Sequence, residues 1–423
     1  MTSSTPRDQL RADLERRHDE FVELCAELIR HPSENPPGDT TEVFAFVGAY
    51  LRERGITHEV VAAQPTLPNI VATFEGGAGA GPHLVLNGHL DVFPAGDRAR
   101  WSVDPFGGVV RDGKLYGRGA NDMKGGVAAL LIAFTTLHAL RAQLRGRLTL
   151  TLVSDEETFG PWGAQYLLEQ DPNLLGDALL NGEPSGLGTV RFAEKGLAWI
   201  ELLVETPGGH GGYAHLSPNA IREAARIIAD LDELRDIAVA TPPELHNLVE
   251  QGRAAIDSEL GASGADASTA VVVSIGTIQG GDKVNMIASH CRVEVDLRCP
   301  IGLELDELLA RFAAIVARYP SARWNLINSS PPNICDPEAH IFALVKANAE
   351  ALSGVRPVPA ISLGGTDSRL WRMRGVPAVF YGPAAHNMGA PDEYVVVDEL
   401  IHVVKTHTLT AWDYLTGSAD ASD

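Results

Sequence analysis

The sequence SDEETFG at residues 154–160 places three acidic residues directly after the apolar run 148–153. This cluster has an ordinary structural explanation, in which Ser154 is the N-cap of a helix near residues 163–169 and Glu157 completes a capping box. It also has a chemical explanation, because a catalytic site can be built from several carboxylates. The other polar residues of the chain decide between the two.

A histidine and an aspartate follow another apolar run, in NGHLDVF at residues 87–93. Side chains alternate in an extended segment, so His89 and Asp91 share one face. A carboxylate beside an imidazole is the usual device for orienting a metal-binding histidine. Taken alone, the pair is more often a surface pair.

A glycine-rich segment, YGRGANDMKGG at residues 116–126, carries Asp122 just before a helical pattern. The alternative interpretation is a dinucleotide or phosphate loop, but neither the Gly-x-Gly-x-x-Gly nor the Gly-x-x-x-x-Gly-Lys-Ser/Thr spacing is present. We therefore expect the glycines to allow a tight turn that points Asp122 inward.

Two more candidate ligands follow strand-like runs: Glu183 in LNGEPSG and His386 in YGPAAH. In open α/β sheets, ligands bind at the carboxyl ends of the strands, where all of these residues are expected to lie. The set combines histidines with several carboxylates, a mixture that suits paired divalent ions. Without cations between them, so many acids would repel one another.

Signatures of other enzyme classes are missing from the sequence. It contains no Gly-x-Ser-x-Gly elbow and no His-Glu-x-x-His motif. The four cysteines have no Cys-x-x-Cys spacing, so we interpret them as reduced and structural.

The apolar pattern predicts an α/β protein with an insertion. Helices are expected over 8–30, 41–54 and 125–142 and from 398, with strands at 70–74, 83–86, 148–153, 178–180 and 378–381. From residue 193 the order changes to β-α-β-β-α-β, and the polar stretch 241–268 is expected to be a long loop or an insertion within it. We therefore predict a catalytic domain from 1–192 and 332–423, with helices on both faces of a mixed, mainly parallel sheet. The predicted inserted α+β domain, ferredoxin-like, covers 193–331.

Charge and hydropathy narrow the class of partner. The formal charge of −21 disfavours nucleic acid and anionic lipid. The charged first 20 residues do not resemble a signal peptide, and no apolar run reaches the length of a membrane span, so we expect a cytoplasmic protein.

Together, these motifs resemble the two-zinc amidohydrolases and exopeptidases, a family that includes succinyl-diaminopimelate desuccinylase, acetylornithine deacetylase, aminoacylase and glutamate carboxypeptidase. The resemblance extends over most of the chain. It is carried by ELIRHPSENPP, NGHLDVFPAGDRARWSVDPFGGVVRDGKLYGRGANDMKGG, VSDEETFG, LLNGEPSG, GGHGGYAHLSPNAI, VNMIASHCRVEVDLRCP, LGGTDSR and HNMGAPDEYV.

The resemblance implies two divalent metal ions, zinc by preference and cobalt or manganese as alternatives. His89 and Glu183 would bind one ion, Glu157 and His386 the other, and Asp122 would bridge both. A non-proline cis peptide bond is implied after Asp122. One spacing differs from many relatives, because residues 387–391 separate His386 from the acidic pair that follows it.

The resemblance also implies roles in catalysis and substrate binding. Glu156 matches the general base and Asp91 the carboxylate that orients His89. His210, with His215 nearby, matches a histidine that reaches across a homodimer interface formed by the inserted domain, which is also expected to act as a lid. The matching substrate-binding positions are Arg298, Asn285, Gly365, Thr366 and Arg369.

We therefore expect a deacylase, desuccinylase or carboxypeptidase that hydrolyses the amide bond of an N-acyl amino acid or small peptide. Its substrate would carry a free carboxylate, because an arginine such as Arg298 suits that group. Glu156 would take a proton from the attacking water and deliver it to the leaving amine. The alternatives are hydrolysis of a non-amide C–N bond, in an amidine or amine, and a non-catalytic relative that only binds carboxylates.

Overall fold

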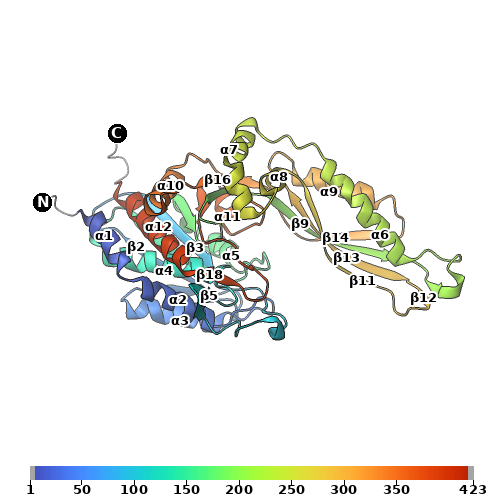
Figure 1. Ribbon diagram of the computed structural model, residues 1–423, viewed down its shortest axis with the longest axis horizontal. Helices are drawn as coiled ribbons and strands as arrows, with labels where there is room; N and C mark the ends of the chain where they lie inside the picture. The colour runs from blue at the N-terminus through green and yellow to red at the C-terminus, as the bar shows by residue number, and fades with distance from the viewer. Residues whose placement is uncertain (1–4, 418–423) are drawn as a thin grey trace.

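The structure is a computed structural model, and it describes residues 5–417. A nine-stranded mixed sheet forms the centre of the larger part of the molecule (Figure 1). In order across the sheet, its strands are β1 (Glu59–Val61), β2 (Asn69–Glu75), β6 (Arg147–Val153), β3 (His83–His89), β7 (Ala178–Asn181), β17 (Ala378–Phe380), β8 (Thr189–Glu194) and β15 (Asn333–Ile334), with β16 (Val358–Ser362) beside β8. The middle strands, β6, β3, β7 and β17, run parallel to one another. The other pairings are antiparallel except that of β16 with β8, which is parallel.

Helices cover both faces of this sheet, as expected. Parallel strands that are buried on both sides read as continuous apolar runs, and β6 is buried from Leu148 to Val153. The larger core lies under α1 (Pro6–Glu15), α2 (His18–Arg30), α3 (Thr41–Glu53), α4 (Lys124–Ala139), α10 (His340–Ser353) and α12 (Val397–Thr416). A smaller core on the opposite face lies under α5 (Ala164–Gln170) and α11 (Ser368–Arg372). The predicted α/β class with a parallel centre is confirmed.

The expected single helix over residues 8–30 is wrong, because α1 ends at Glu15 and α2 begins at His18. Between them Arg17 has non-helical backbone angles, φ −112° and ψ 18°. Its guanidinium bonds to Thr136 Oγ1 at 3.0 Å and to Asp13 and Glu20, which fixes the bend against α4.

The capping box at residues 154–157 is also wrong. The helix that follows, α5, has Gly163 as its N-cap, nine positions after Ser154. Asp155 and Phe159 both take positive φ, 68° and 51°, so the chain turns instead of entering a helix. Ser154 Oγ donates to the carbonyl of Pro68 at 2.6 Å, which ties this turn to the end of the sheet.

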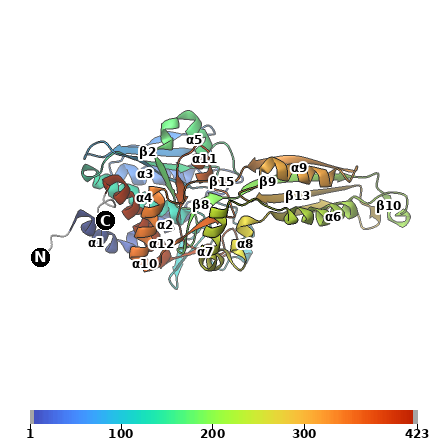
Figure 2. The same ribbon diagram turned by 90° about the horizontal axis from the view of Figure 1, so that it is seen from above.

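The inserted segment builds a second sheet with the predicted β-α-β-β-α-β order. Its four strands are all antiparallel in the order β11-β13-β9-β14, and two helices bury its second core. The elements in chain order are β9 (Gly196–Glu205), α6 (Ala220–Asp230), β11 (Val272–Gly280), β13 (His290–Cys299), α9 (Leu305–Val316) and β14 (Ala322–Ser330). Figures 1 and 2 show them as a long arm with the short strands β10 (Gly209–His210) and β12 (Met286–Ile287) at its far end.

The expected loop at 241–268 is wrong. It forms helices α7 (Pro243–Leu260) and α8 (Gly264–Thr269), which lie where the arm meets the nine-stranded sheet (Figure 1). Leu245, Val249 and Ile256 of α7 are buried in the larger core, so this part of the segment packs with the nine-stranded sheet. The assignment of all of 193–331 to one inserted domain therefore stays a prediction.

A third, three-stranded sheet supports one edge of the candidate site. It joins β4 (Val109–Arg111), β5 (Lys114–Tyr116) and β18 (Tyr394–Val396), all antiparallel. The pairing brings the DEY motif that ends at Tyr394 beside the glycine-rich segment after Tyr116.

All four cysteines are free thiols, and Cys25, Cys291 and Cys299 are buried, which agrees with the structural role expected for them. Among the helices formed by residues 5–417, none combines the length and the apolar character that a membrane crossing requires.

Candidate metal and catalytic site

His89 ends β3 and is fixed by Asp91, two residues later on the same face. Its Nδ1 lies 2.9 Å from the Asp91 carbonyl oxygen, which can accept the Nδ1 proton, and 3.5 Å from the Asp91 carboxylate. The side chain is 1% exposed. This arrangement directs the other ring nitrogen, Nε2, away from the backbone and leaves it free to bind a cation.

Two other candidate ligands lie close to His89 Nε2. Asp122 Oδ1 and Glu183 Oε1 each lie 3.2 Å from it, and the ligand atoms of the three residues lie within 4.8 Å of one another. Within the part of the chain that the structure describes, His89 Nε2, Asp122 Oδ1 and Glu156 Oε1 are buried and have no hydrogen-bond partner. Buried polar atoms are normally satisfied, so this group fits a bound cation. The cis peptide bond expected after Asp122 is present.

Asp91 also positions the acidic turn. Its carboxylate accepts hydrogen bonds from the backbone N–H groups of Glu156 and Glu157, at 3.3 and 3.1 Å, and from Asn35 Nδ2 at 3.0 Å. Burial would raise the pKa of Asp91, but the hydrogen bond and charge of His89, together with Asn35 and the Glu157 N–H, lower it. Asp91 is therefore a fixed anion that links His89 to both glutamates.

Three glutamates around this group have raised pKa values, so each of them favours a bound proton or a nearby cation. Burial, followed by the charges of Glu183 and Asp367, raises the pKa of Glu156 well above its usual range, against the influence of His89. Burial and the nearby Asp122 charge raise the pKa of Glu157 well above its usual range. The same two causes raise the pKa of Glu183 to about 7. A cation among these carboxylates would favour their charged forms.

Glu393 supports Asp122 from the third sheet, a contact that sequence reasoning missed. It is buried, forms an ion pair with Arg118, and accepts the backbone N–H groups of Asn121 at 2.9 Å and Asp122 at 3.2 Å. Its place in the DEY motif after His386 is the only signal in the sequence that could have found it.

Glu157 and His386 lie outside the three-residue group. Glu157 lines the same cavity, and its Oε1 accepts the N–H of Phe93 at 3.2 Å. His386 follows the cavity residue Ala385, but its ring stacks on Tyr394 at 4.7 Å and its Nε2 lies 3.5 Å from Glu399. The structure thus brings Glu157 to the site, and it holds His386 at the margin.

The candidate ligands open into a cavity of about 420 Å³ between the catalytic sheet and the base of the arm. Arg298, Gly365 and Thr366 line it as expected, and Arg298 donates to Asp296 at 2.8 Å. Arg369 stands behind this wall, with its guanidinium 4.1 Å from the ring of Phe159 and a hydrogen bond to the carbonyl of Thr366. Other lining residues that the sequence did not single out are Phe93, Phe159, Arg191, Trp199, Glu259, Leu260 and Met388.

His210 and Asn285 lie far from this cavity within one chain. His210 lies in β10 and Asn285 directly precedes β12. These two strands pair at the distal end of the arm, where the Gly211 N–H donates to the Asn285 carbonyl at 2.7 Å (Figures 1 and 2). His210 is exposed, and its Nδ1 accepts the Gly212 N–H at 3.1 Å. The structure brings these two residues together, but not to the candidate ligands.

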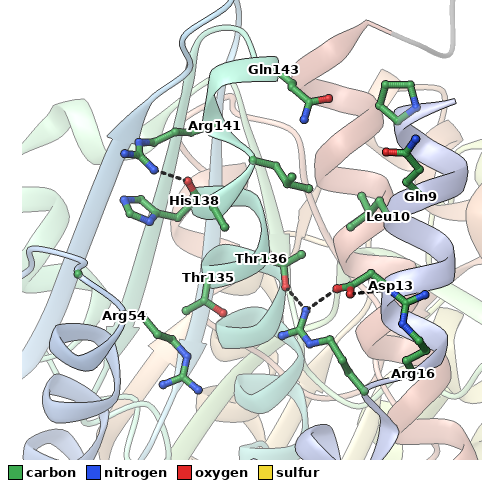
Figure 3. A pocket seen from close by; sticks show the side chains of 15 residues that line it. Gln9, Leu10, Asp13, Arg16, Arg54, Thr135, Thr136, His138, Arg141 and Gln143 are labelled. Atoms are coloured by element: carbon green, nitrogen blue, oxygen red, sulfur yellow. Dashed lines mark hydrogen bonds and ion pairs between the residues drawn. The ribbon is translucent and has the colours of Figure 1, made fainter.

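A larger cavity, of about 760 Å³, lies between α1 and α4 and contains none of the candidate site residues (Figure 3). Its arginines have partners: Arg16 and Arg17 pair with Asp13, and Arg141 donates to the His138 carbonyl at 2.8 Å. The chemistry of the site therefore belongs to the smaller cavity.

The sequence is similar to those of known proteins over most of its length. A sequence model of the Peptidase family M20/M25/M40 matches residues 85–413. The chain is 31% identical over 392 residues to the succinyl-diaminopimelate desuccinylase of Methylocella silvestris, covering 90% of this chain and 94% of that protein.

Two solved structures share the fold. The M20 family metallo-carboxypeptidase Sso-CP2 from Sulfolobus solfataricus superposes with a TM-score of 0.80 at 18% identity, over 93% of this chain and 99% of that one. The YXEP protein of Bacillus subtilis, a dinuclear metal binding peptidase, has a TM-score of 0.65 at 18% identity, over 95% and 99%. The chain belongs to the Peptidase family M20/M25/M40.

Proposed function

We propose that this protein is a metal-dependent hydrolase that cleaves the amide bond of an N-acyl amino acid or small peptide with a free carboxylate. The observation that carries the proposal is the group formed by His89, Asp122 and Glu183, whose ligand atoms lie within 4.8 Å of one another. His89 Nε2 and Asp122 Oδ1 have no hydrogen-bond partner within residues 5–417, and Asp122 and Glu183 line the cavity. Family membership and the desuccinylase relative support the same reaction class.

We infer two metal sites that share Asp122. His89 and Glu183 would hold one ion, and Glu157 and His386 the other; His386 would have to turn from Tyr394 toward the cavity. Ions bound here would supply a Lewis acid for the carbonyl and lower the pKa of a water molecule. The mixture of imidazole and carboxylate ligands suits zinc, with cobalt or manganese as alternatives.

Glu156 is the proposed proton carrier. Its Oε1 is buried and has no hydrogen-bond partner among the described residues, while its Oε2 lies 3.8 Å from His89 Nε2. A carboxylate whose pKa is raised by burial can take a proton from the attacking water and deliver it to the leaving amine. Asp91 holds the backbone N–H of Glu156, so it would keep this carboxylate in place.

Arg298 is the proposed anchor for the substrate carboxylate. It reaches the cavity wall from β13, and its pairing with Asp296 through Nε and Nη2 fixes the orientation of the guanidinium. Gly365 has no room for a side chain, since a Cβ there would lie 2.6 Å from the ring of Phe159. We infer that Gly365 and Thr366 bound the substrate pocket and that Arg369 and Asn285 complete it.

A homodimer would bring the distal end of the arm to a second catalytic site. His210 could then donate a hydrogen bond to the scissile carbonyl of the partner's substrate, a contribution worth ~3–4 kcal/mol for an oxyanion donor. Exposed apolar side chains beside it, including Tyr213, Leu216, Val284 and Met286, support an interface in this region. We also propose a cytoplasmic location, where the free thiols would stay reduced.

The test is hydrolysis of a substrate panel by protein stripped of metal and then reloaded with zinc, cobalt or manganese. We expect activity on succinyl, acetyl, formyl or aminoacyl derivatives of amino acids, dependent on the metal. Preference for an amidine or an amine over every amide would contradict the proposed reaction. Metal content near zero in protein purified without chelator would instead favour a non-catalytic relative.

A further inference from the structure

Glu259, near the end of α7, is an acid on the cavity wall that the proposed metal and proton chemistry does not use. Its Oε1 accepts the N–H of Gly188 at 2.9 Å. A Cβ on Gly186 would come within 1.9 Å of Oε2, so the carboxylate lies directly over the loop that follows Glu183. Glu259 is therefore held in position beside a proposed metal ligand.

The cations of the cavity wall are already engaged. Arg191 is buried and donates to the carbonyls of Ser185 and Ile361, at 2.9 and 3.2 Å. Arg298 is bound to Asp296. The charge of Glu259 raises the pKa of Arg191, although burial lowers that pKa more strongly. In the described part of the chain, no ion pair within 4.0 Å joins Glu259 to a cation. Glu259 thus lines the cavity without an ion-pair partner among the described residues.

The end of α7 adds to this negative potential. The helix spans 18 residues and ends at Leu260, which also lines the cavity. The last carbonyl groups of a helix carry partial negative charge and favour a cation at that end. Two separate features, a side chain and a helix terminus, therefore make the same part of the wall attractive to a positive group.

We propose that Glu259 is a specificity-determining residue that binds a cationic amino group of the substrate, while Arg298 binds its carboxylate. This inference rests on the proposed amide hydrolysis and narrows its substrate class to N-acylated amino acids or small peptides that also carry an ammonium group. The helix that supplies Glu259 comes from the inserted segment but packs in the larger core, so the acid stays fixed relative to the candidate metal ligands.

The experiment compares two pairs of substrates that differ only in the ammonium group: the Nα-succinyl and Nα-acetyl forms of L-lysine and of L-norleucine. We expect the metal-loaded enzyme to favour the lysine member of a pair by about tenfold in kcat/KM, because charge complementarity discriminates partners. Glu259→Gln keeps an oxygen that can accept the Gly188 N–H and removes only the charge. We expect it to bring the lysine to norleucine ratio close to one, mainly by lowering kcat/KM for the lysine substrate.

Two further variants separate charge from support of the loop. Glu259→Ala removes both, so it should lose the preference and also lower kcat/KM for norleucine substrates. Glu250→Gln changes an exposed acid of the same helix that pairs with Arg253, and it should keep the wild-type ratio. An unchanged ratio in Glu259→Gln, or an equal loss on both substrates, would overturn the inference while the hydrolase assignment stands. Failure of the wild-type enzyme on every acylated substrate would defeat the hydrolase assignment itself.

Discussion

The three consecutive acids after β6 have different tasks in the structure. Asp155 organises the turn by accepting Thr158 Oγ1 at 2.7 Å, the Trp162 N–H at 3.1 Å and Asn35 Nδ2 at 3.2 Å. Glu156 and Glu157 line the cavity beside the candidate metal group. The three acids therefore do not form the helix cap that the sequence suggested. Asp155 stabilises a turn, and Glu156 and Glu157 lie beside the proposed cations.

At the residue scale, Glu156→Gln tests the proposed proton carrier. Glutamine fills the same space but cannot take or release a proton, so kcat should fall by about 10²–10⁴-fold. Metal content and thermal unfolding should stay close to wild type, because Glu156 is not among the proposed ligands. Steady-state kinetics, metal analysis and calorimetry measure the three quantities, and a variant with full turnover would remove Glu156 from the mechanism.

His407 gives a prediction about acid stability. It is buried in α12, where its Nε2 lies 2.7 Å from the Tyr381 carbonyl, and burial lowers its pKa to about 4. As the pH falls from about 6.5 to about 4, His407 binds a proton in the unfolded chain but stays neutral in the folded protein. The free energy of unfolding therefore decreases over this range. The loss from this one group approaches about 3 kcal/mol.

Urea unfolding at a series of pH values checks this expectation. His407→Gln can still donate to the Tyr381 carbonyl but does not titrate, so its stability should depend less on pH between about 6.5 and 4. His246→Gln, at an exposed position of α7, is the matched control and should keep the wild-type slope. Equal slopes in the two variants would show that His407 is not the group responsible.

At the scale of elements, the periodic segments of the sheet could be predicted and the turns that place its polar residues could not. The apolar runs before His89 and Glu156 mark β3 and β6 because both strands are buried. No sequence pattern predicts that Asp155 and Phe159 adopt positive φ. These two residues turn the chain, so the next helix begins later than the sequence suggested. The hydrogen bonds of Glu393 to the glycine-rich segment join residues about 270 positions apart, so they depend on tertiary packing.

Helix α7 was missed for a different reason. Leu245, Val249 and Ile256 repeat at helical spacing, but residues 241–268 are polar and rich in Ala, Gly and Ser, and this composition suggested a loop. The repeat becomes meaningful only when a second surface covers it, and here β16 and the larger core provide that surface. Periodicity was a better guide than composition in this segment.

The packing of α7 leads to a stability prediction. Ile256→Ala should lower the free energy of unfolding by about 2–5 kcal/mol, because it removes a fully buried side chain from the larger core. Ser258→Ala, at an exposed site two residues later, should change it by less than about 0.5 kcal/mol. Chemical denaturation measures both. Equal, small effects would mean that α7 is not part of the cooperative fold.

At the scale of the whole molecule, the chain separates groups that the proposed reaction needs together. The candidate metal ligands lie at the carboxyl ends of the catalytic strands, whereas His210 lies at the far end of the arm (Figure 2). Several apolar side chains near His210 are exposed in the single chain, and Val284 is fully exposed. A symmetric dimer would cover such a patch and bring each arm to the neighbouring site.

Mixing two inactive variants tests this arrangement directly. Glu156→Ala should inactivate the site of its own chain, and His210→Ala should inactivate the site of its partner. In a mixed dimer the His210→Ala chain keeps Glu156 and receives an intact histidine, so one of its two sites works. Random exchange makes half of the dimers mixed, and about a quarter of wild-type activity should return. Size-exclusion chromatography with light scattering must show dimers that exchange subunits. If such dimers form and no activity returns, His210 does not act across the interface; if His210→Ala is fully active alone, it does not act in catalysis.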